Sequence, residues 1–302
     1  MRPRVYEDDP QFDPRPASLT NLKNRPKPRM NYRIIMVCTM LGLFPSPASL
    51  AKSWATVDGP TREPPHAIGQ TTNGCLAGAM PLPLEGKGYL VMHLERHRYF
   101  GHPSLIRAVQ ALGQQAAQSA VGVLQIGDLG QARGGPMPFG HRSHQSGLDA
   151  DIWFNLDPGL YLRTDALRAN VSAPSLLNVT RKGLDREIWS DRHVTLLELA
   201  ARLPAVDRVF VNPYIKRELC ATVKGSRSWL RKIRPWHGHD DHFHIRLVCP
   251  PGSPDCEPQE AVPAGEGCDA SLDWWFQAHP PGPPPPPKPP LPAGCQTVLD
   301  KP

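Results

Sequence analysis

The stretch that decides the fold is His242-Phe-His-Ile-Arg-Leu247, in which polar and apolar residues alternate without a break. Successive side chains of a β-strand point to opposite faces, so this alternation predicts a strand with one face on the core. The three apolar residues, beginning with Phe243, would pack inward. His242, His244 and Arg246 would share the other face and line a cleft.

A second segment, GHRSHQSGLDADIW (140–153), also concentrates residues that can do chemistry. Glycine and proline content predicts a loop over residues 131–140, and residues 149–154 have the pattern of a strand. His144 therefore enters from a loop, and Asp151 follows on a strand. Asp149 lies two residues before Asp151 on the same face, where it can hold a ligand residue in place.

These residue types suit a catalytic zinc ion, which takes nitrogen, oxygen or sulfur ligands in a tetrahedral array and keeps one position for water. His144 and Asp151 supply an imidazole and a carboxylate, and the HxH strand can supply a third ligand. A lone histidine is more often structural, and Asp151 alone could cap or pair. The combination of His-x6-Asp with a distant HxH has few such explanations.

Further elements surround these two segments. Helical spacing of apolar residues predicts a helix over 103–119, with Pro103 in its first turn. A second helix is predicted over 191–203, with Asp191 as its N-cap. Short apolar runs predict strands at 121–126 and 206–211.

The N-terminal region has the pattern of a secretory signal peptide. Residues 1–29 are polar and proline-rich, MNYR (30–33) precedes an apolar stretch at 34–44, and small residues follow at 48–51. Such a short apolar run does not span a bilayer comfortably. We predict that residues 1–29 are a non-native extension and that residues 30–51 are a signal cleaved near Ala51. An uncleaved anchor is the alternative.

Of the 7 cysteines, Cys38 lies in the predicted signal and six follow it. An even number in an exported chain predicts three disulfides, whose connectivity the sequence does not set. Zinc binding by these thiols is the alternative, but none of them forms a Cys-x2-Cys pair. The six are Cys75, Cys220, Cys249, Cys256, Cys268 and Cys295.

Many of the 37 prolines cluster in HPPGPPPPPKPPLPA (279–293). Such a run favours an extended polyproline II helix that cannot join a sheet. Because Cys295 follows the run, we predict that residues 249–302 form a strap tied back onto the domain. The proline run then serves as a linker, with a recognition motif as the alternative.

The net charge of +6 over 302 residues is mild, and both nucleic acid and anionic cell wall would suit a positive chain. No basic stripe with interleaved aromatic residues is present, and the chain is predicted to be exported. We therefore predict no nucleic-acid partner and no stable membrane insertion after signal cleavage. The sequence carries no indication of the oligomeric state.

Six stretches closely resemble the penicillin-insensitive murein endopeptidases, a group related to lysostaphin-type peptidases, D-Ala-D-Ala carboxypeptidases and the hedgehog signalling domain. The stretches are TNGCLAGA (72–79), YFGHP (99–103), SHQSGLDADIW (143–153), FVNPYIK (210–216), WLRKIRPW (229–236) and HFHIRL (242–247). The resemblance runs from residue 72 to 295. It implies a compact α+β domain with a central antiparallel sheet. It also implies a periplasmic enzyme that cuts the D-alanyl–meso-diaminopimelate cross-link of peptidoglycan.

Carried over residue by residue, the resemblance implies that His144, Asp151 and His244 are zinc ligands. It implies that His242 is the catalytic base or stabilises the transition state. It further implies a second metal site that uses His141, for which the segment VTRKGLD (179–185) does not clearly supply the other partners. The disulfides that it implies are Cys75–Cys295, Cys220–Cys268 and Cys249–Cys256.

We therefore predict an irregular lead-in at 52–74, a single α+β zinc peptidase domain at 75–248 with flanking helices, and the strap. His239 is the alternative to His242 as base. Arg142 and Arg246 could hold substrate carboxylates or be ordinary surface charges. The alternative functions are a zinc D,D-carboxypeptidase acting on wall peptides and a non-catalytic zinc-containing module that binds the wall.

Overall fold

The computed structural model describes residues 52–57, 59–156, 164–279 and 287–302. Apart from Pro287, these belong to one compact unit. The strands are β1 (His66–Gln70), β2 (Asn73–Ala77), β3 (Met80–Pro81), β4 (Glu85–Gly86), β5 (Tyr89–Val91), β6 (Phe100–Gly101), β7 (Leu124–Ile126), β8 (Asp149–Trp153), β9 (Val206–Val211), β10 (Ile233–Pro235) and β11 (His242–Leu247). The helices are α1 (Pro103–Gln118), α2 (Asp165–Ala169), α3 (Asp191–Arg202), α4 (Pro213–Thr222), α5 (Ala270–Asp273) and α6 (Ala293–Asp300), with 3-10 turns η1 (Leu94–Arg96), η3 (Ser228–Lys232) and η4 (Trp274–Phe276).

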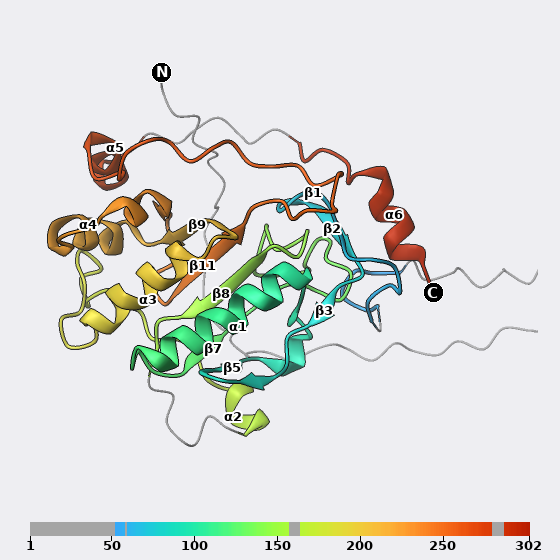
Figure 1. The fold of residues 1–302 in the computed structure, drawn as a ribbon, viewed down its shortest axis with the longest axis horizontal. Coiled ribbons are helices and arrows are strands. Elements are labelled where there is room, and N and C mark those ends of the chain that lie inside the picture. Colours follow the sequence, from blue (N-terminus) through green and yellow to red (C-terminus); the bar gives the residue numbers. More distant parts are fainter. Residues whose placement is uncertain (1–51, 58, 157–163, 280–286) are drawn as a thin grey trace, which may run out of the picture. The chain divides into compact units, whose positions relative to one another are not determined.

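A seven-stranded sheet in the order β10-β9-β11-β8-β7-β5-β4 forms the centre of the fold (Figure 1). Its central strands β9, β11, β8 and β7 are antiparallel to their neighbours in that series. Towards the edges, β10 runs parallel to β9 and β5 runs parallel to β7. A parallel pair needs a crossover connection, and α1 and α4 lie in the two crossovers. The predicted α+β class is confirmed.

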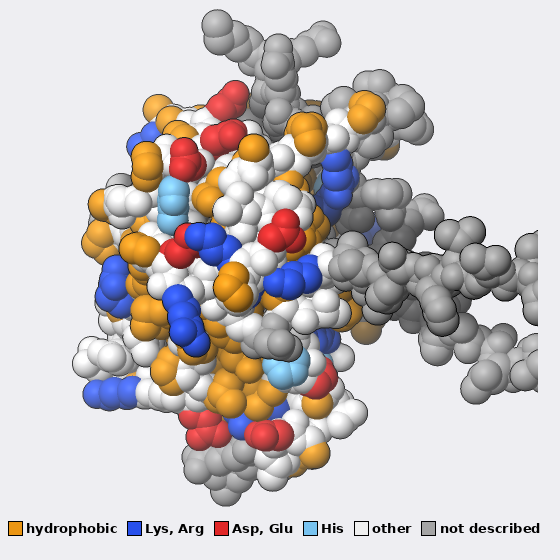
Figure 2. Space-filling view, turned by 90° about the vertical axis from the view of Figure 1, so that its right-hand side faces the viewer, with side chains coloured by type: hydrophobic (Ala, Val, Ile, Leu, Met, Phe, Trp, Pro, Cys, Tyr) orange, Lys and Arg blue, Asp and Glu red, His pale blue; other side chains and the backbone are white. Residues whose placement is uncertain are grey.

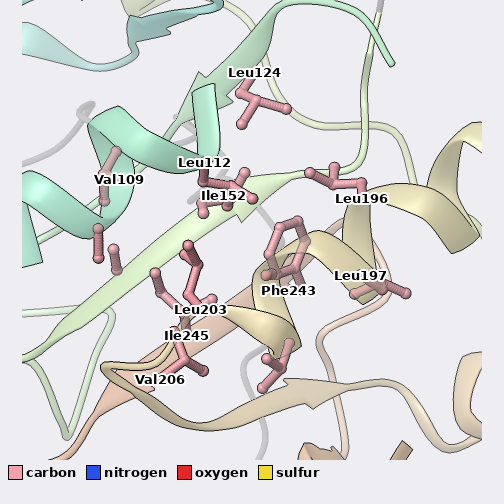
Figure 3. Close-up of a cluster of buried hydrophobic side chains, with 14 of the residues drawn as sticks. Val109, Leu112, Leu124, Ile152, Leu196, Leu197, Leu203, Val206, Phe243 and Ile245 are labelled. Carbon is pink, nitrogen blue, oxygen red and sulfur yellow. The ribbon is translucent and has the colours of Figure 1, made fainter. Parts of the chain in front are cut away.

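The hydrophobic core lies between one face of this sheet and the helices α1 and α3 (Figures 1 and 3). Leu112 of α1, Leu196 of α3, and Ile152, Phe243 and Ile245 of the sheet are all completely buried. The apolar half of the alternating β11 pattern therefore faces the helices, as predicted. Burial of apolar surface at about 25 cal/mol per Å² makes this packing the main stabilising term.

Local sequence signals begin each long helix. The His102 side chain accepts a hydrogen bond from the Ser104 backbone N–H at 3.1 Å, and Pro103 occupies the first turn of α1. For α3 the predicted N-cap, Asp191, is wrong, because the cap is Ser190. His193 completes a capping box by accepting from the Ser190 N–H at 3.1 Å, a role more commonly taken by Glu or Gln.

The lead-in at 52–74 is less irregular than predicted. Strand β1 lies within it and pairs with β2 as an antiparallel hairpin. The outer end of β1 is also held by the C-terminal region, where the Gly69 N–H donates to the Asp255 carbonyl at 2.8 Å. Most of β2, and Asp255, lie outside the segment, so its own composition did not reveal the strand.

Strands β8 and β11 pair directly, with His244 opposite Asp151 and Arg246 opposite Asp149. Asp149 is completely buried and its Oδ1 accepts from Arg246 Nε at 2.6 Å. Burial alone would raise the pKa of the Asp149 carboxyl, but the Arg246 guanidinium and His244 hold it well below its usual range. This cross-strand ion pair fixes the register of the two strands on their polar face.

Three disulfides join the pairs that the resemblance implied, Cys75–Cys295, Cys220–Cys268 and Cys249–Cys256. Cys295 lies on α6, whose C-terminal carbonyls accept hydrogen bonds from the buried side chain of Arg133, at 2.9 Å for Leu299. The C-terminal helix is therefore tied to the domain both covalently and by hydrogen bonds. The predicted signal and extension, and residues 280–286 of the proline run, lie outside the described residues.

Among the described residues, no helix is both long and apolar enough to cross a membrane. On the face shown in Figure 2, Lys and Arg side chains are interspersed with Asp and Glu side chains. The described part of that face therefore carries charge of both signs.

Replacing both Cys75 and Cys295 by alanine should lower the free energy of unfolding by about 3–5 kcal/mol, because the bond closes a loop with a sequence separation of 220. Replacing Cys249 and Cys256, with a separation of 7, should cost about 2 kcal/mol. Urea unfolding of the mature chain measures both. Equal losses would show that loop length does not govern their contributions.

The variant Arg246→Met should lower the free energy of unfolding at pH 7 by about 3–5 kcal/mol, because it removes the guanidinium from the buried Asp149 carboxylate and leaves it only the His144 N–H and the contact with His244. Without the guanidinium, the pKa of Asp149 rises from its lowered value, because only His244 and His144 then oppose the effect of burial. The stability difference from wild type should therefore shrink as pH falls through the acid range and the carboxyl becomes protonated.

Urea unfolding of chelator-treated protein at several pH values tests this expectation. The control is Arg202→Met, which removes an arginine from an exposed pair with Glu198 and should cost about 0–1 kcal/mol at every pH. A pH-independent loss for Arg246→Met would contradict the role given to the buried carboxylate.

Candidate metal centre

Asp151 lies among four histidine side chains at the polar face of β8 and β11. Its Oδ1 lies 3.2 Å from His244 Nδ1 and 3.5 Å from His144 Nε2. His242 Nε2 lies 3.7 Å from the same oxygen, and His141 Nδ1 lies 3.4 Å from Oδ2. Burial would raise the pKa of this carboxyl, but the surrounding imidazoles hold it well below its usual range. Asp151 is therefore ionised at neutral pH.

The His144 side chain is completely buried and held in one orientation. Its Nδ1 donates to the Leu129 carbonyl at 2.6 Å, which leaves Nε2 with its lone pair exposed to Asp151. Its backbone N–H donates to Asp149 Oδ2 at 2.9 Å, and its φ of 66° is in the left-handed region. A backbone carbonyl that fixes the tautomer of a histidine is a common support for a metal ligand. Asp149 thus holds the His144 loop, as its position on the strand predicted.

The predicted set of His144, Asp151 and His244 is brought together around the Asp151 carboxylate. The rings of His144 and His244 have centroids 4.7 Å apart and meet edge to face. His244 Nε2 lies 3.0 Å from Asp149 Oδ1, as a charge contact without hydrogen-bond geometry. The second strand therefore reaches the same carboxylate as the His144 loop.

In the described part of the chain, His141, His144 and Asp151 form the one group of three side chains whose ligand atoms all lie within 4.8 Å of one another. His141, for which the resemblance implied a second metal site, thus lies next to His144 and Asp151. His244 does not belong to this group of three, although its Nδ1 contacts Asp151.

Asp128 supports the centre and was not identified from the sequence. Its carboxylate accepts from His141 Nε2 at 3.0 Å and from Arg98 Nη1 at 2.8 Å, and its carbonyl accepts from the Asp151 N–H at 3.0 Å. Burial opposes ionisation, but His141 and Arg98 lower its pKa to about 2. The sequence signal was its position directly after β7, at the end of a strand beside β8.

His242 lies beside the centre and is oriented by Asp241, whose Oδ1 is 2.5 Å from its Nδ1. Burial lowers the pKa of His242, but the charge of Asp151 and the hydrogen bond to Asp241 outweigh it and raise the pKa to about 9. His239 behaves differently, since burial and the neighbouring imidazole of His242 lower its pKa to about 3. His239 is therefore neutral, with its Nδ1 donating to the His237 carbonyl at 3.0 Å.

The two arginines predicted as carboxylate ligands differ in position. Arg246 is only 6% exposed and pairs with Asp149, so it is neither a surface charge nor open to a substrate. The strand alternation placed it correctly on the polar face, but its ion pair across the sheet was not visible in the sequence. Arg142 is exposed, in the loop between His141 and His144.

The donor set fits a metal ion. His144 Nε2 and Asp151 Oδ1 are buried and have no hydrogen-bond partner among the described residues, and His244 Nδ1 lies 3.2 Å from that same carboxylate oxygen. An unsatisfied buried polar atom costs about 1–3 kcal/mol, so two that face each other require an explanation. A cation that accepts their lone pairs provides one, because imidazole nitrogen and carboxylate oxygen are common metal ligands.

Comparisons with known proteins agree with this geometry. A family model described as penicillin-insensitive murein endopeptidase matches residues 67–300. A protein of that name from Haemophilus influenzae is 45% identical over 240 residues, covering 78% of this chain and 82% of the relative.

Two further relatives carry the same name. The Yersinia enterocolitica protein is 42% identical over 257 residues, covering 84% of this chain and 93% of the relative. The Klebsiella pneumoniae (strain 342) protein is 42% identical over 269 residues, covering 88% of this chain and 97% of the relative. The match covers both β8 and β11, and with them every residue of the metal centre. The chain belongs to the penicillin-insensitive murein endopeptidase family.

Proposed function

We propose that the protein is a zinc metalloendopeptidase that cleaves D-alanyl–meso-diaminopimelyl cross-links in peptidoglycan, and that it acts in the periplasm after export. Family membership supports the coarser part of this statement, a peptidase that acts on murein. The observation that carries the metal-dependent part is that the buried atoms His144 Nε2 and Asp151 Oδ1, neither of them hydrogen-bonded, face each other, with His244 Nδ1 3.2 Å from the same carboxylate oxygen.

Zinc held by these side chains would polarise the scissile carbonyl and lower the pKa of a water molecule to about 7. The residues around the centre prepare it for that ion. The Leu129 carbonyl fixes the His144 tautomer, and the Asp149 carboxylate lies against His244. The preorganised ligands need little rearrangement to bind the ion, which favours affinity.

His242 is suited to handle a proton or a negative charge at its Nε2. Its Nδ1 is held by Asp241, and its Nε2 lies 3.7 Å from Asp151 Oδ1. With a pKa of about 9 in the metal-free chain it is an imidazolium at neutral pH, which would stabilise an oxyanion. A cation bound to Asp151 offsets the charge that raises this pKa, and so moves it towards the range of a general base. His239, with a pKa of about 3, is a poorer base.

Two other functions use the same residues. A zinc D,D-carboxypeptidase would release a terminal D-alanine, whereas an endopeptidase would release monomers from cross-linked dimers. A zinc-containing wall-binding module would bind sacculi and release nothing. Mass spectrometry of the fragments from purified sacculi distinguishes all three, and family membership favours the endopeptidase.

Replacing His144, Asp151 or His244 by alanine should remove bound zinc and abolish cleavage, because a three-ligand site loses most of its affinity for the ion when one ligand is removed. Metal content is measured by mass spectrometry, and cleavage by the release of muropeptide monomers from dimers. A chelator should stop wild-type cleavage, and added zinc should restore it. Cleavage that persists in metal-stripped protein would contradict the metallopeptidase assignment.

The same metal analysis decides the role of His141. We expect one ion per wild-type chain, because the described residues offer one ligand group. The variant His141→Ala should retain that ion with weaker affinity, since His141 orders Asp151. Two ions in wild type and one in His141→Ala would instead establish the second site that the resemblance implied.

His242→Ala should keep its zinc and lose about 10²–10⁴-fold in kcat, because positioned proton transfer contributes about that much. His239→Ala is the comparison, with a small effect expected. The release of monomers under substrate saturation gives kcat for both. Full turnover by His242→Ala would remove this residue from the mechanism.

A further inference from the structure

A pocket opens beside the metal centre, between the chain near Leu177, the start of α4, the His237–Gly238 turn and η4. The sequence pattern did not indicate this pocket. The side chains that line it include Arg181, Asn212, Tyr214, His237, Trp275 and Phe276.

The pocket and the metal centre share the short segment 237–242. Asn212 donates from its backbone to the His239 carbonyl and from its side chain to the Gly238 carbonyl, each at 2.9 Å. The rings of His239 and His242 have centroids 5.0 Å apart. A substrate whose scissile bond lies at the metal centre can therefore reach the pocket with the neighbouring part of the same molecule.

Arg181 gives the pocket its charge. It is the one Lys, Arg, Asp or Glu among the described lining residues. Its side chain is 62% exposed, and Nη2 pairs with Asp240 Oδ2 at 3.0 Å. A guanidinium has five donors in a planar fork, so this contact leaves other donors of a pocket-lining residue available to a ligand. The Ser175 hydroxyl donates a hydrogen bond to the same Asp240 oxygen, which holds the Asp240 side chain in place beside Arg181.

The rest of the wall is mainly aromatic. Tyr214 and Phe276 meet edge to face with centroids 5.0 Å apart, and His237 and Trp275 do the same at 5.0 Å. The Cys220–Cys268 disulfide ties α4 to the segment that leads into α5 and η4. This bond limits the movement of the backbone that carries the two aromatic pairs. Rings held this way offer apolar contact to an aliphatic chain.

We propose that this pocket binds a carboxylate-bearing arm of the cross-linked peptide, with Arg181 pairing with the carboxylate and the aromatic rings packing on the adjacent aliphatic chain. The inference rests on the proposed function, because it concerns the same substrate. The lining of the pocket includes Arg181 and no acidic residue, so the guanidinium donors that Asp240 does not occupy favour an anionic ligand. Arg181 is thus a specificity residue that acts in binding and not in bond cleavage.

The experiment compares a cross-linked peptide dimer that has free carboxylates with the same dimer after amidation. Wild-type KM should rise about tenfold on amidation, with kcat within about twofold, because a charge-assisted contact is lost in ground state and transition state alike. Arg181→Gln should raise KM about tenfold for the free-acid dimer and should show no further rise on amidation. Arg181→Lys should retain part of the discrimination.

The matched control is Arg186→Gln. Arg186 lies five residues along the chain, is 67% exposed and also pairs with a carboxylate, that of Glu218, but it does not line the pocket. This variant should keep the wild-type KM and the wild-type response to amidation. An unchanged response in Arg181→Gln, or the same loss in Arg186→Gln, would overturn the proposal, as would a wild-type KM that is indifferent to amidation.

Calorimetry with an uncross-linked peptide monomer, free-acid or amidated, separates this proposal from the proposed function. The monomer has no cross-link to be cut, so its binding to the zinc-loaded protein does not depend on cleavage. Absence of dimer cleavage together with Arg181-dependent binding of the free-acid monomer would refute the endopeptidase and support the pocket. Cleavage of the dimer without Arg181-dependent binding of the monomer would support the endopeptidase and refute the role proposed for the pocket.

Discussion

The antiparallel pairing of β8 with β11 is the constraint on which the rest of the structure depends. A single register places Ile152 opposite Phe243 on the core face and Asp151 opposite His244 on the polar face. Because side chains alternate along both strands, a slip of one residue would reverse both faces together. The packing of α1 and α3 on the apolar face therefore also fixes the geometry of the metal centre on the other.

Burying the charged side chains on the polar face of this strand pair costs free energy. Asp149 and Asp151 are both enclosed, and an isolated carboxylate in such a place would be strongly destabilising. Asp149 is satisfied within the protein, by Arg246 and the His144 backbone. Asp151 Oδ1 is surrounded by imidazoles without a hydrogen bond. Asp149 thus organises the structure, and Asp151 keeps an oxygen without a hydrogen bond that a bound cation would coordinate.

The C-terminal region does more than close the domain. The sequence predicted residues 249–302 as a strap, and two disulfides and the Arg133 contacts join its described parts to the rest of the domain. Within it, η4 brings Trp275 and Phe276 to the pocket next to the metal centre. A segment with little regular structure can form part of a binding wall because the disulfide at Cys268 restricts the conformations open to it.

The sequence by itself determined the main elements near the site, because their signals are local. Alternation defined β11, apolar spacing and Pro103 defined α1, and the pattern of His144, Asp151 and the HxH strand named residues that do meet. Local signals were insufficient where a partner lies far along the chain. The Asp149–Arg246 pair, the support that Asp128 gives to His141, the β1–β2 hairpin's contact with Asp255 and the pocket around Arg181 all join distant segments. Tertiary structure alone decided these, since ion pairs and pockets depend on distances in space that residue type and spacing do not encode.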